Sequence, residues 1–264
     1  MLGVRMKHLL VSRVFWAAVV LFAGIMIAGV YEDLLAARAN AFSVLYLYMV
    51  TTSVGIAHVL TAAVPTIPFA FFYVEELEKK AVYYNLIRCS KRSYYLSNIA
   101  AAVLSSVLVT VFALLVFVLV CLAFGAGFEN GGSLGGLMSV YGVSVFGEWL
   151  EDGRLIHVLL INLLAFVAYS SPWGLLCLVI SIFSKNKYVV ISFPFIFHIA
   201  ASYILQSSPL ARFDPALTLL KGLFVLGMPY GGIFYALGYH GVFITVFSVC
   251  YYVMSRRRYR REGI

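Results

Sequence analysis

Charged residues are scarce in this sequence: Asp, Glu, Lys and Arg make up 11% of its 264 residues, whereas hydrophobic residues make up 63%. Six long apolar runs contain none of these four residue types. Proton and sodium pumps, voltage sensors and ion-coupled carriers place ionisable side chains at membrane depth, where each is costly and is kept for function. The apolar excess therefore indicates a membrane protein. The uncharged runs argue against a pump or an ion-coupled carrier.

The sequence is also poor in ligand and nucleotide motifs. Its four cysteines are scattered and form no Cys-x-x-Cys pair, which argues against a disulfide framework or a metal site: Cys89, Cys121, Cys177 and Cys250. No Gly-x-x-x-x-Gly-Lys-Ser/Thr loop is present, and the glycine-rich stretch at residues 131–136 contains no lysine. We therefore expect a chain that is not an enzyme and holds no cofactor or metal. Energy for any uphill transport would come from another chain.

The apolar runs predict an all-α, polytopic membrane protein with a single transmembrane domain over residues 1–264. At about 1.5 Å per residue, even the shortest run is just long enough to cross about 30 Å of hydrocarbon. The second and third runs are longer than a bilayer requires, so we expect them to project beyond it, the second with a bend near Pro65 and Pro68. The six predicted spans are residues 14–30, 41–73, 94–124, 156–183, 188–206 and 233–254.

The segments outside these spans have distinct characters. Residues 1–13 combine three basic residues with leucine and methionine at helical spacing, which predicts an interfacial helix. A cleaved signal peptide is the alternative, but its Ala-x-Ala site at residues 39–41 lies well beyond the first apolar run. Residues 125–155 form a glycine-rich outer loop, to which we assign no fold. Residues 207–232 are too apolar for a solvated loop and predict an outer re-entrant helical segment before the last span.

The distribution of charge predicts the orientation. Fifteen of the 19 basic residues fall in the segments that this topology places inside, and seven of the 11 acidic residues fall outside. This agrees with the positive-inside rule and places both termini in the cytosol, with the protein in the cytoplasmic membrane. The net charge of +8 therefore needs no nucleic acid as partner. We expect the arginines after residue 255 to bind anionic lipid head groups.

Residues 75–93, the polar segment, are the long polar interruption between the second and third spans. Glu75 precedes Lys79 by four residues, and Glu76 precedes Lys80 by four, an order that favours a solvent-exposed helix. An apolar stripe is expected at Leu77, Ala81 and Tyr84, and a basic turn follows at Ser90, Lys91 and Arg92. Ser93 is placed to cap the next helix. The polar segment therefore predicts a short inner helix that is available to a partner.

These features resemble the transmembrane subunit of a type-2 ABC exporter. The resemblance covers the whole chain in architecture: six spans, inner termini, a basic amphipathic N-terminus and an over-long second helix. Its sequence-specific part is limited to about Glu75 to Asn98, where a glutamate, a helical stretch, a leucine and Ser-Lys-Arg precede a long span. The sequence departs from the family at Cys89, where proline is frequent, and at Asn98, where lysine is common.

The resemblance implies an export mechanism that needs several chains. Two such subunits, identical or paralogous, would pair in the membrane, and each would dock on one of two copies of a separate ATP-binding subunit that holds ATP and magnesium. Leu86 and Ile87 would be the apolar anchors of this coupling helix. The contact residues that the resemblance implies are Glu75, Glu76, Leu86, Ile87, Arg88, Ser90, Lys91 and Arg92. With 16% aromatic residues and an uncharged interior, we expect an amphipathic cargo such as a peptide, lipid or drug-like molecule.

Two helix faces carry small or mildly polar residues at helical spacing. One is formed by Thr51, Gly55, His58, Ala62 and Pro65, and the other by Pro194, His198 and Ser202. Small residues suit close helix contact in lipid, so these faces could meet the partner permease or the substrate path. Packing within the chain explains them equally well. The histidines are too scattered to indicate a metal site.

Other functions remain open. A solvated inner loop is the simpler interpretation of the polar segment, and a passive channel or a membrane assembly subunit also fits an uncharged interior. An intramembrane protease of the abortive-infection type requires Glu-Glu-x-x-x-Arg, whereas this sequence has Glu75 and Glu76 with Lys80. That family also requires histidines followed four residues later by Asn or Asp. His58, His198 and His240 are followed at that spacing by Ala62, Ser202 and Ile244, which argues against the protease.

Overall fold

The computed structural model describes residues 1–53, 57–79, 81–128, 149, 152–208, 213–214 and 231–261. Within these ranges the chain is all-helical, apart from one isolated bridge between Ser43 and Gly127. The all-α prediction is confirmed for this part of the chain. The elements are α1 (Leu2–Val11), α2 (Arg13–Ala28), α3 (Tyr31–Ala36), α4 (Val44–Ser53), α5 (Ala57–Leu60), η1 (Val64–Thr66), α6 (Ile67–Glu78), α7 (Ala81–Arg88), α8 (Lys91–Ala123), α11 (Leu155–Ile180), α12 (Lys187–Gln206) and α14 (Gly231–Arg261).

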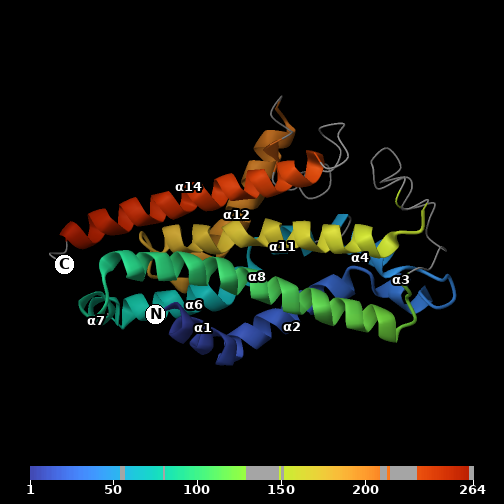
Figure 1. Ribbon diagram of the computed structural model, residues 1–264, viewed down its shortest axis with the longest axis horizontal. Helices are drawn as coiled ribbons and strands as arrows, with labels where there is room; N and C mark the ends of the chain where they lie inside the picture. Colours follow the sequence, from blue (N-terminus) through green and yellow to red (C-terminus); the bar gives the residue numbers. More distant parts are fainter. Residues whose placement is uncertain are drawn as a thin grey trace.

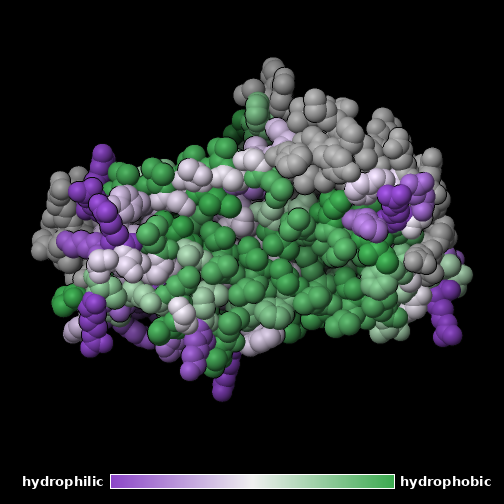
Figure 2. Space-filling model, viewed as in Figure 1, coloured by the Kyte–Doolittle hydropathy of each residue, from purple (hydrophilic) through white to green (hydrophobic). Residues whose placement is uncertain are grey.

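Helices α8, α11 and α14 run roughly along the longest axis of the molecule, and α12 is inclined to it (Figure 1). Helix α11 lies at the centre and packs against α8, α14 and α12, while α2 packs against α8. Hydrophilic residues gather at the two ends of this axis and an apolar belt lies between them (Figure 2). Five helices in the described ranges are long and apolar enough to cross a membrane, or six if the bent pair α1 and α2 counts as one span. These features are those of a multi-pass membrane protein.

The first predicted span is shorter than expected. Helix α2 has 16 residues, and only together with α1 does it reach the length of a span. The two helices meet at a bend of 63°, where the Ser12 hydroxyl accepts a hydrogen bond from the Phe15 amide at 3.1 Å and caps α2. Helix α1 is therefore separated from α2 by a sharp bend, while the predicted position of residues 1–13 at the membrane interface stays a prediction.

The second predicted span is not one continuous helix. Its described parts are α4, α5, η1 and α6, and a turn at residues 61–63 lies between α5 and η1; residues 57–78 are long and apolar enough to cross a membrane. Pro65 lies in η1 and Pro68 lies in the first turn of α6. Proline has no amide hydrogen to donate and is tolerated best in a first helical turn, so it favours new starts over one long helix. Where the prolines predict a bend, the α-helix is interrupted by the 3-10 helix η1.

The later spans lie close to their predicted positions. Helix α8 begins at Lys91 because Ser90, and not Ser93, is its N-cap: the Ser90 hydroxyl accepts from the Ser93 amide at 3.3 Å. Helix α14 continues past residue 254 into the basic cluster, where Arg258 donates a hydrogen bond to the Ile182 carbonyl oxygen. The predicted outer segments, residues 125–155 and 207–232, lie largely outside the described residues, so the re-entrant helix stays a prediction.

Candidate functional site

The end of the bundle that carries α7 also carries the N-terminus and the last turns of α14 (Figure 1). We call it the α7 end. Helix α7 contacts α6 and α8. Val82 is buried, whereas Tyr84 exposes 67% and Ile87 exposes 81% of its surface. One face of this short helix is therefore fixed to the bundle, and the other presents two large apolar side chains at a hydrophilic end of the molecule.

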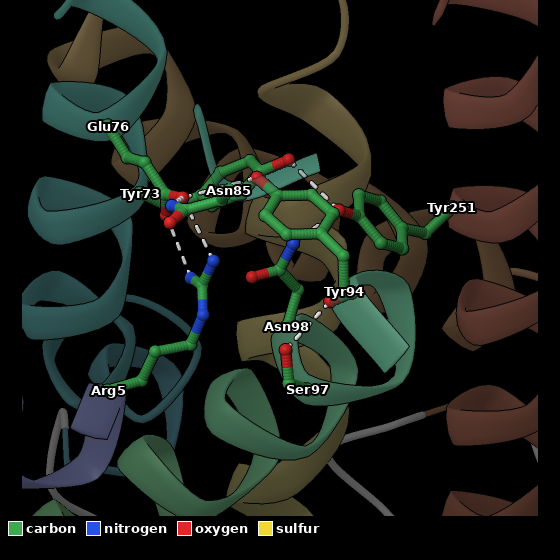
Figure 3. Close-up of polar contacts among 8 residues, drawn as sticks. All are labelled: Arg5, Tyr73, Glu76, Asn85, Tyr94, Ser97, Asn98 and Tyr251. Carbon is green, nitrogen blue, oxygen red and sulfur yellow. Dashed lines mark hydrogen bonds and ion pairs between the residues drawn. The ribbon is translucent and has the colours of Figure 1, made fainter. Parts of the chain in front are cut away.

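A buried ion pair lies directly beneath α7. Both terminal nitrogens of Arg5, on α1, donate to the Glu76 carboxylate of α6, at 2.8 and 2.9 Å (Figure 3). The two side chains expose only 4% and 6% of their surface. The Arg5 guanidinium also lies over the rings of Phe72 and Tyr94, 5.7 and 5.1 Å from their centroids. Two parallel charge-assisted hydrogen bonds and two aromatic faces together offset the cost of burying this arginine.

Glu76 joins four elements. Besides Arg5, it accepts a hydrogen bond from the Asn85 amide of α7 and one from the Tyr94 hydroxyl of α8 at 3.4 Å (Figure 3). Burial is the largest single influence on Arg5 and opposes its charge, but the charge and hydrogen bonds of Glu76 and Tyr94 together favour it more strongly, so that the pKa of Arg5 lies above its ordinary value. Helix α7 is thus tied through one buried carboxylate to α1, α6 and α8.

A second polar group links α6, α8 and α14 at the same end. The hydroxyls of Tyr73 and Tyr251 lie 2.9 Å apart, and the Asn98 amide donates to the Tyr251 hydroxyl at 2.9 Å (Figure 3). All three side chains are buried. Asn98 fixes the long helices α8 and α14 to each other by a neutral hydrogen bond.

The residues of the polar segment are divided between exposed and buried positions. Glu75 and Lys79 form the predicted exposed pair at 3.2 Å. Glu76 departs from its predicted exposed position because Arg5 pairs with it inside the bundle. The side chains of Ile87, Arg88, Ser90, Lys91 and Arg92 are exposed, as a contact surface requires. Lys80 and the side chain of Leu86 lie outside the described residues.

The predicted helix faces are brought into the interior. Thr51 is fully buried and its hydroxyl donates to the Met26 carbonyl oxygen at 2.8 Å, while Ala62 and Pro65 are also buried. Gly55 lies in the part of the chain that is not described, so the predicted stripe as a whole stays a prediction. These contacts favour packing within the chain as the role of Thr51.

The histidines lie closer together than their sequence positions indicate. The Tyr169 hydroxyl is 3.1 Å from His198 Nε2, the His58 and His198 ring centroids are 6.5 Å apart, and those of Tyr169 and His240 are 5.5 Å apart. Nearby, Asp214 is buried and accepts hydrogen bonds from Ser202 at 2.6 Å and Gln206 at 2.7 Å. Even so, the described ranges contain no group of three or more side chains arranged to hold a metal ion.

Comparison with known proteins adds no family to this description. No protein-family model matches the sequence, and no curated protein or solved structure matches it either. The function is therefore inferred from the residues of this chain and from the exposed face of α7.

Proposed function

We propose that this chain is the permease subunit of an ATP-driven exporter of the type-2 ABC class. The observation that carries the proposal is α7. A short helix exposes Ile87 and Tyr84 at a hydrophilic end of the molecule, while Asn85 of the same helix is tied to the bundle through Glu76. Its exposed face is available to a partner protein. Its other face is attached to the bundle, so that a movement of the partner would be passed on to the spans.

The orientation in this proposal follows from charge. The α7 end carries the basic first turn of α8 and the basic last turns of α14, and Lys187 of α12 lies near Phe71 of α6. Because basic residues concentrate on the cytoplasmic side of membrane proteins, the α7 end faces the cytosol. A cytosolic ATP-binding subunit would then reach Tyr84 and Ile87 directly.

The mechanism that we propose uses the buried contacts as a lever. Closure of two ATP-binding subunits around ATP and magnesium would displace both copies of α7. Glu76 would pass the displacement to α1 through Arg5 and to α8 through Tyr94. The spans would then change the access of the path between the two permeases, and an amphipathic peptide, lipid or drug-like molecule would leave the cell.

The outer surfaces of two spans support pairing in the membrane. Of the membrane-spanning apolar stretch of α12 only 17% is buried within the chain, and of that of α14 only 11%. These helices therefore face lipid or a second permease, identical or paralogous. Small and aromatic side chains on their surfaces suit both.

The test is recovery of the ATPase. Tagged permease is co-expressed with a candidate ATP-binding subunit and purified in mild detergent. Replacing Leu86 and Ile87 with Asp should abolish recovery of the ATPase, because two charges would replace the apolar anchors of the contact. The matched control is Leu35→Asp on α3, a side chain that is 57% exposed and remote from α7. Undiminished recovery with the double variant would contradict the proposal.

A further inference from the structure

A cavity of about 450 Å³ lies among α1, α6 and α7. Its wall is mostly apolar and includes Val4 of α1 and Phe72 of α6. Polar and charged groups also line it, among them His8 of α1 and Arg88 at the end of α7. The buried pair of Arg5 and Glu76 forms a further part of the lining and holds α1 and α6 together beside the cavity.

The charges around this cavity do not balance. Arg5 is neutralised by Glu76, and Lys79 pairs with Glu75 at 3.2 Å. Arg88 forms no ion pair with an acid in the described part of the chain, although it lines the same cavity. One permanent positive charge therefore faces the cavity without a negative partner, and His8 is placed to add a second donor.

The position of α1 indicates what kind of anion fits. Helix α1 meets α2 at 63° and exposes Val4 by 63% and Val11 by 75%. An amphipathic helix that bends away from a membrane span in this way lies at the boundary between head groups and acyl chains. A ligand that enters beside Val4 would meet apolar surface first and the guanidinium of Arg88 at its polar end.

We propose that this cavity binds one anionic phospholipid of the inner leaflet. The phosphate pairs with Arg88 and accepts a hydrogen bond from His8, and an acyl chain lies along Val4 and Phe72. The lipid bridges α1 and α7, two of the elements that Glu76 joins. This inference rests on the membrane position of the α7 end in the proposed function. It does not depend on the ATP-binding subunit.

The experiment measures lipid retained by the permease alone, in the absence of any ATPase. Full-length protein is reconstituted in nanodiscs of equal parts phosphatidylcholine and phosphatidylglycerol, released into mild detergent and examined by native mass spectrometry. We expect one phosphatidylglycerol per chain to be retained in preference to phosphatidylcholine. Arg88→Gln should lower this retention about five- to tenfold, the loss expected for one charge-assisted contact.

Two further variants separate the cavity from general surface charge. Arg92→Gln removes an exposed arginine in the first turn of α8 that does not line the cavity, and it should leave retention unchanged. Val4→Trp keeps every charge but fills the apolar part of the cavity, and it should lower retention as Arg88→Gln does. Equal effects of Arg88→Gln and Arg92→Gln, or equal retention of the two lipids by the unaltered protein, would overturn the proposal.

A second experiment asks whether the cavity binds free inorganic phosphate in place of the phosphate group of a lipid. Thermal unfolding of the detergent-solubilised protein is followed with 10 mM phosphate or with micellar phosphatidylglycerol at a concentration of about 1 mM, a range suited to weak ligands. The lipid should raise the apparent Tm and phosphate should not. An equal rise with phosphate would assign the cavity to a free anion and overturn the lipid assignment.

Discussion

At the scale of single residues, Glu76 explains why α7 is held firmly. Its carboxylate is almost inaccessible to solvent and receives donors from α1, α7 and α8. A charge buried in this way is stable only while its partners remain, because removing one partner leaves an uncompensated charge in a region of low dielectric. Arg5 is the only described partner of Glu76 that carries a positive charge, so the stability of the α7 end depends on it.

Replacement of Arg5 with Met should therefore destabilise the protein strongly. We expect a loss of about 3–5 kcal/mol in the free energy of unfolding, as for other buried pairs that lose one member. The measurement is the apparent Tm of the purified protein in detergent. Lys79→Met is the matched control, because it breaks the Glu75 pair in the same segment while its side chain is 73% exposed. The control should cost less than about 1 kcal/mol.

The double variant Arg5→Met with Glu76→Leu gives the decisive comparison. It removes both charges, so no buried carboxylate is left unpaired, and it should be more stable than Arg5→Met alone. If the single and the double variant unfold at the same temperature, the instability has another cause, such as lost aromatic contact with Phe72 and Tyr94. A small effect of Arg5→Met would show that water reaches Glu76.

The ion pair also marks a limit of sequence reasoning. The spacing of Glu75 and Lys79 predicts their exposed pair correctly, because both partners lie one helical turn apart. The same rule gives Glu76 an exposed position, whereas its partner Arg5 lies 71 residues away in the sequence. Local spacing carries no information on such a contact. The grouping of Tyr169, His198 and His240 is missed for the same reason.

At the scale of elements, the long spans are predictable because an apolar run longer than a bilayer has few alternatives to a helix. The predicted spans agree with α8, α11 and α12 to within a few residues at each end. The second span shows where this reasoning stops. Its apolar run is continuous, but a turn at residues 61–63 and the 3-10 helix η1 separate α5 from α6, and hydropathy does not reveal such an irregularity within an apolar run.

Close packing of α8 against α11 depends on one glycine. A Cβ added to Gly174 would lie 2.6 Å from both the Ala102 carbonyl oxygen and the Ser106 hydroxyl, which is too close for any side chain without movement of α8. Helices in lipid associate largely through such close van der Waals contact, since apolar burial gives little net drive there. The contact between these two helices therefore holds the centre of the bundle together.

Gly174→Val should separate α8 from α11 and destabilise the protein by roughly 1–3 kcal/mol, the cost typical of overpacking. The apparent Tm in detergent is again the measurement. Gly24→Val on α2 is the matched control, because nothing lies within 4 Å of its added Cβ and the helix there has open space. Comparable losses from the two variants would mean that valine disturbs the helix backbone and not the contact between helices.

At the scale of the whole molecule, hydrophilic residues at both ends and an apolar belt between them define a membrane axis but not its direction (Figure 2). The direction rests on the basic residues that gather at the α7 end. If it is correct, α7 is cytosolic and α3 lies on the outer side, since α3 is at the opposite end of the bundle (Figure 1). An outward α7 could not meet an ATP-binding subunit, so this orientation decides the proposed function.

The cysteines allow the orientation to be measured. Cys89 directly follows α7 and is partly exposed, whereas Cys121 and Cys177 are buried. In cells that carry the Cys250→Ser variant, a membrane-impermeant maleimide should label Cys89 only after the membrane is permeabilised. Glu32→Cys in a Cys89→Ser, Cys250→Ser background places the thiol at an exposed position of α3, and it should be labelled in intact cells. Labelling of Cys89 in intact cells would invert the topology. It would also remove the coupling role of α7, because no ATP is available on that side.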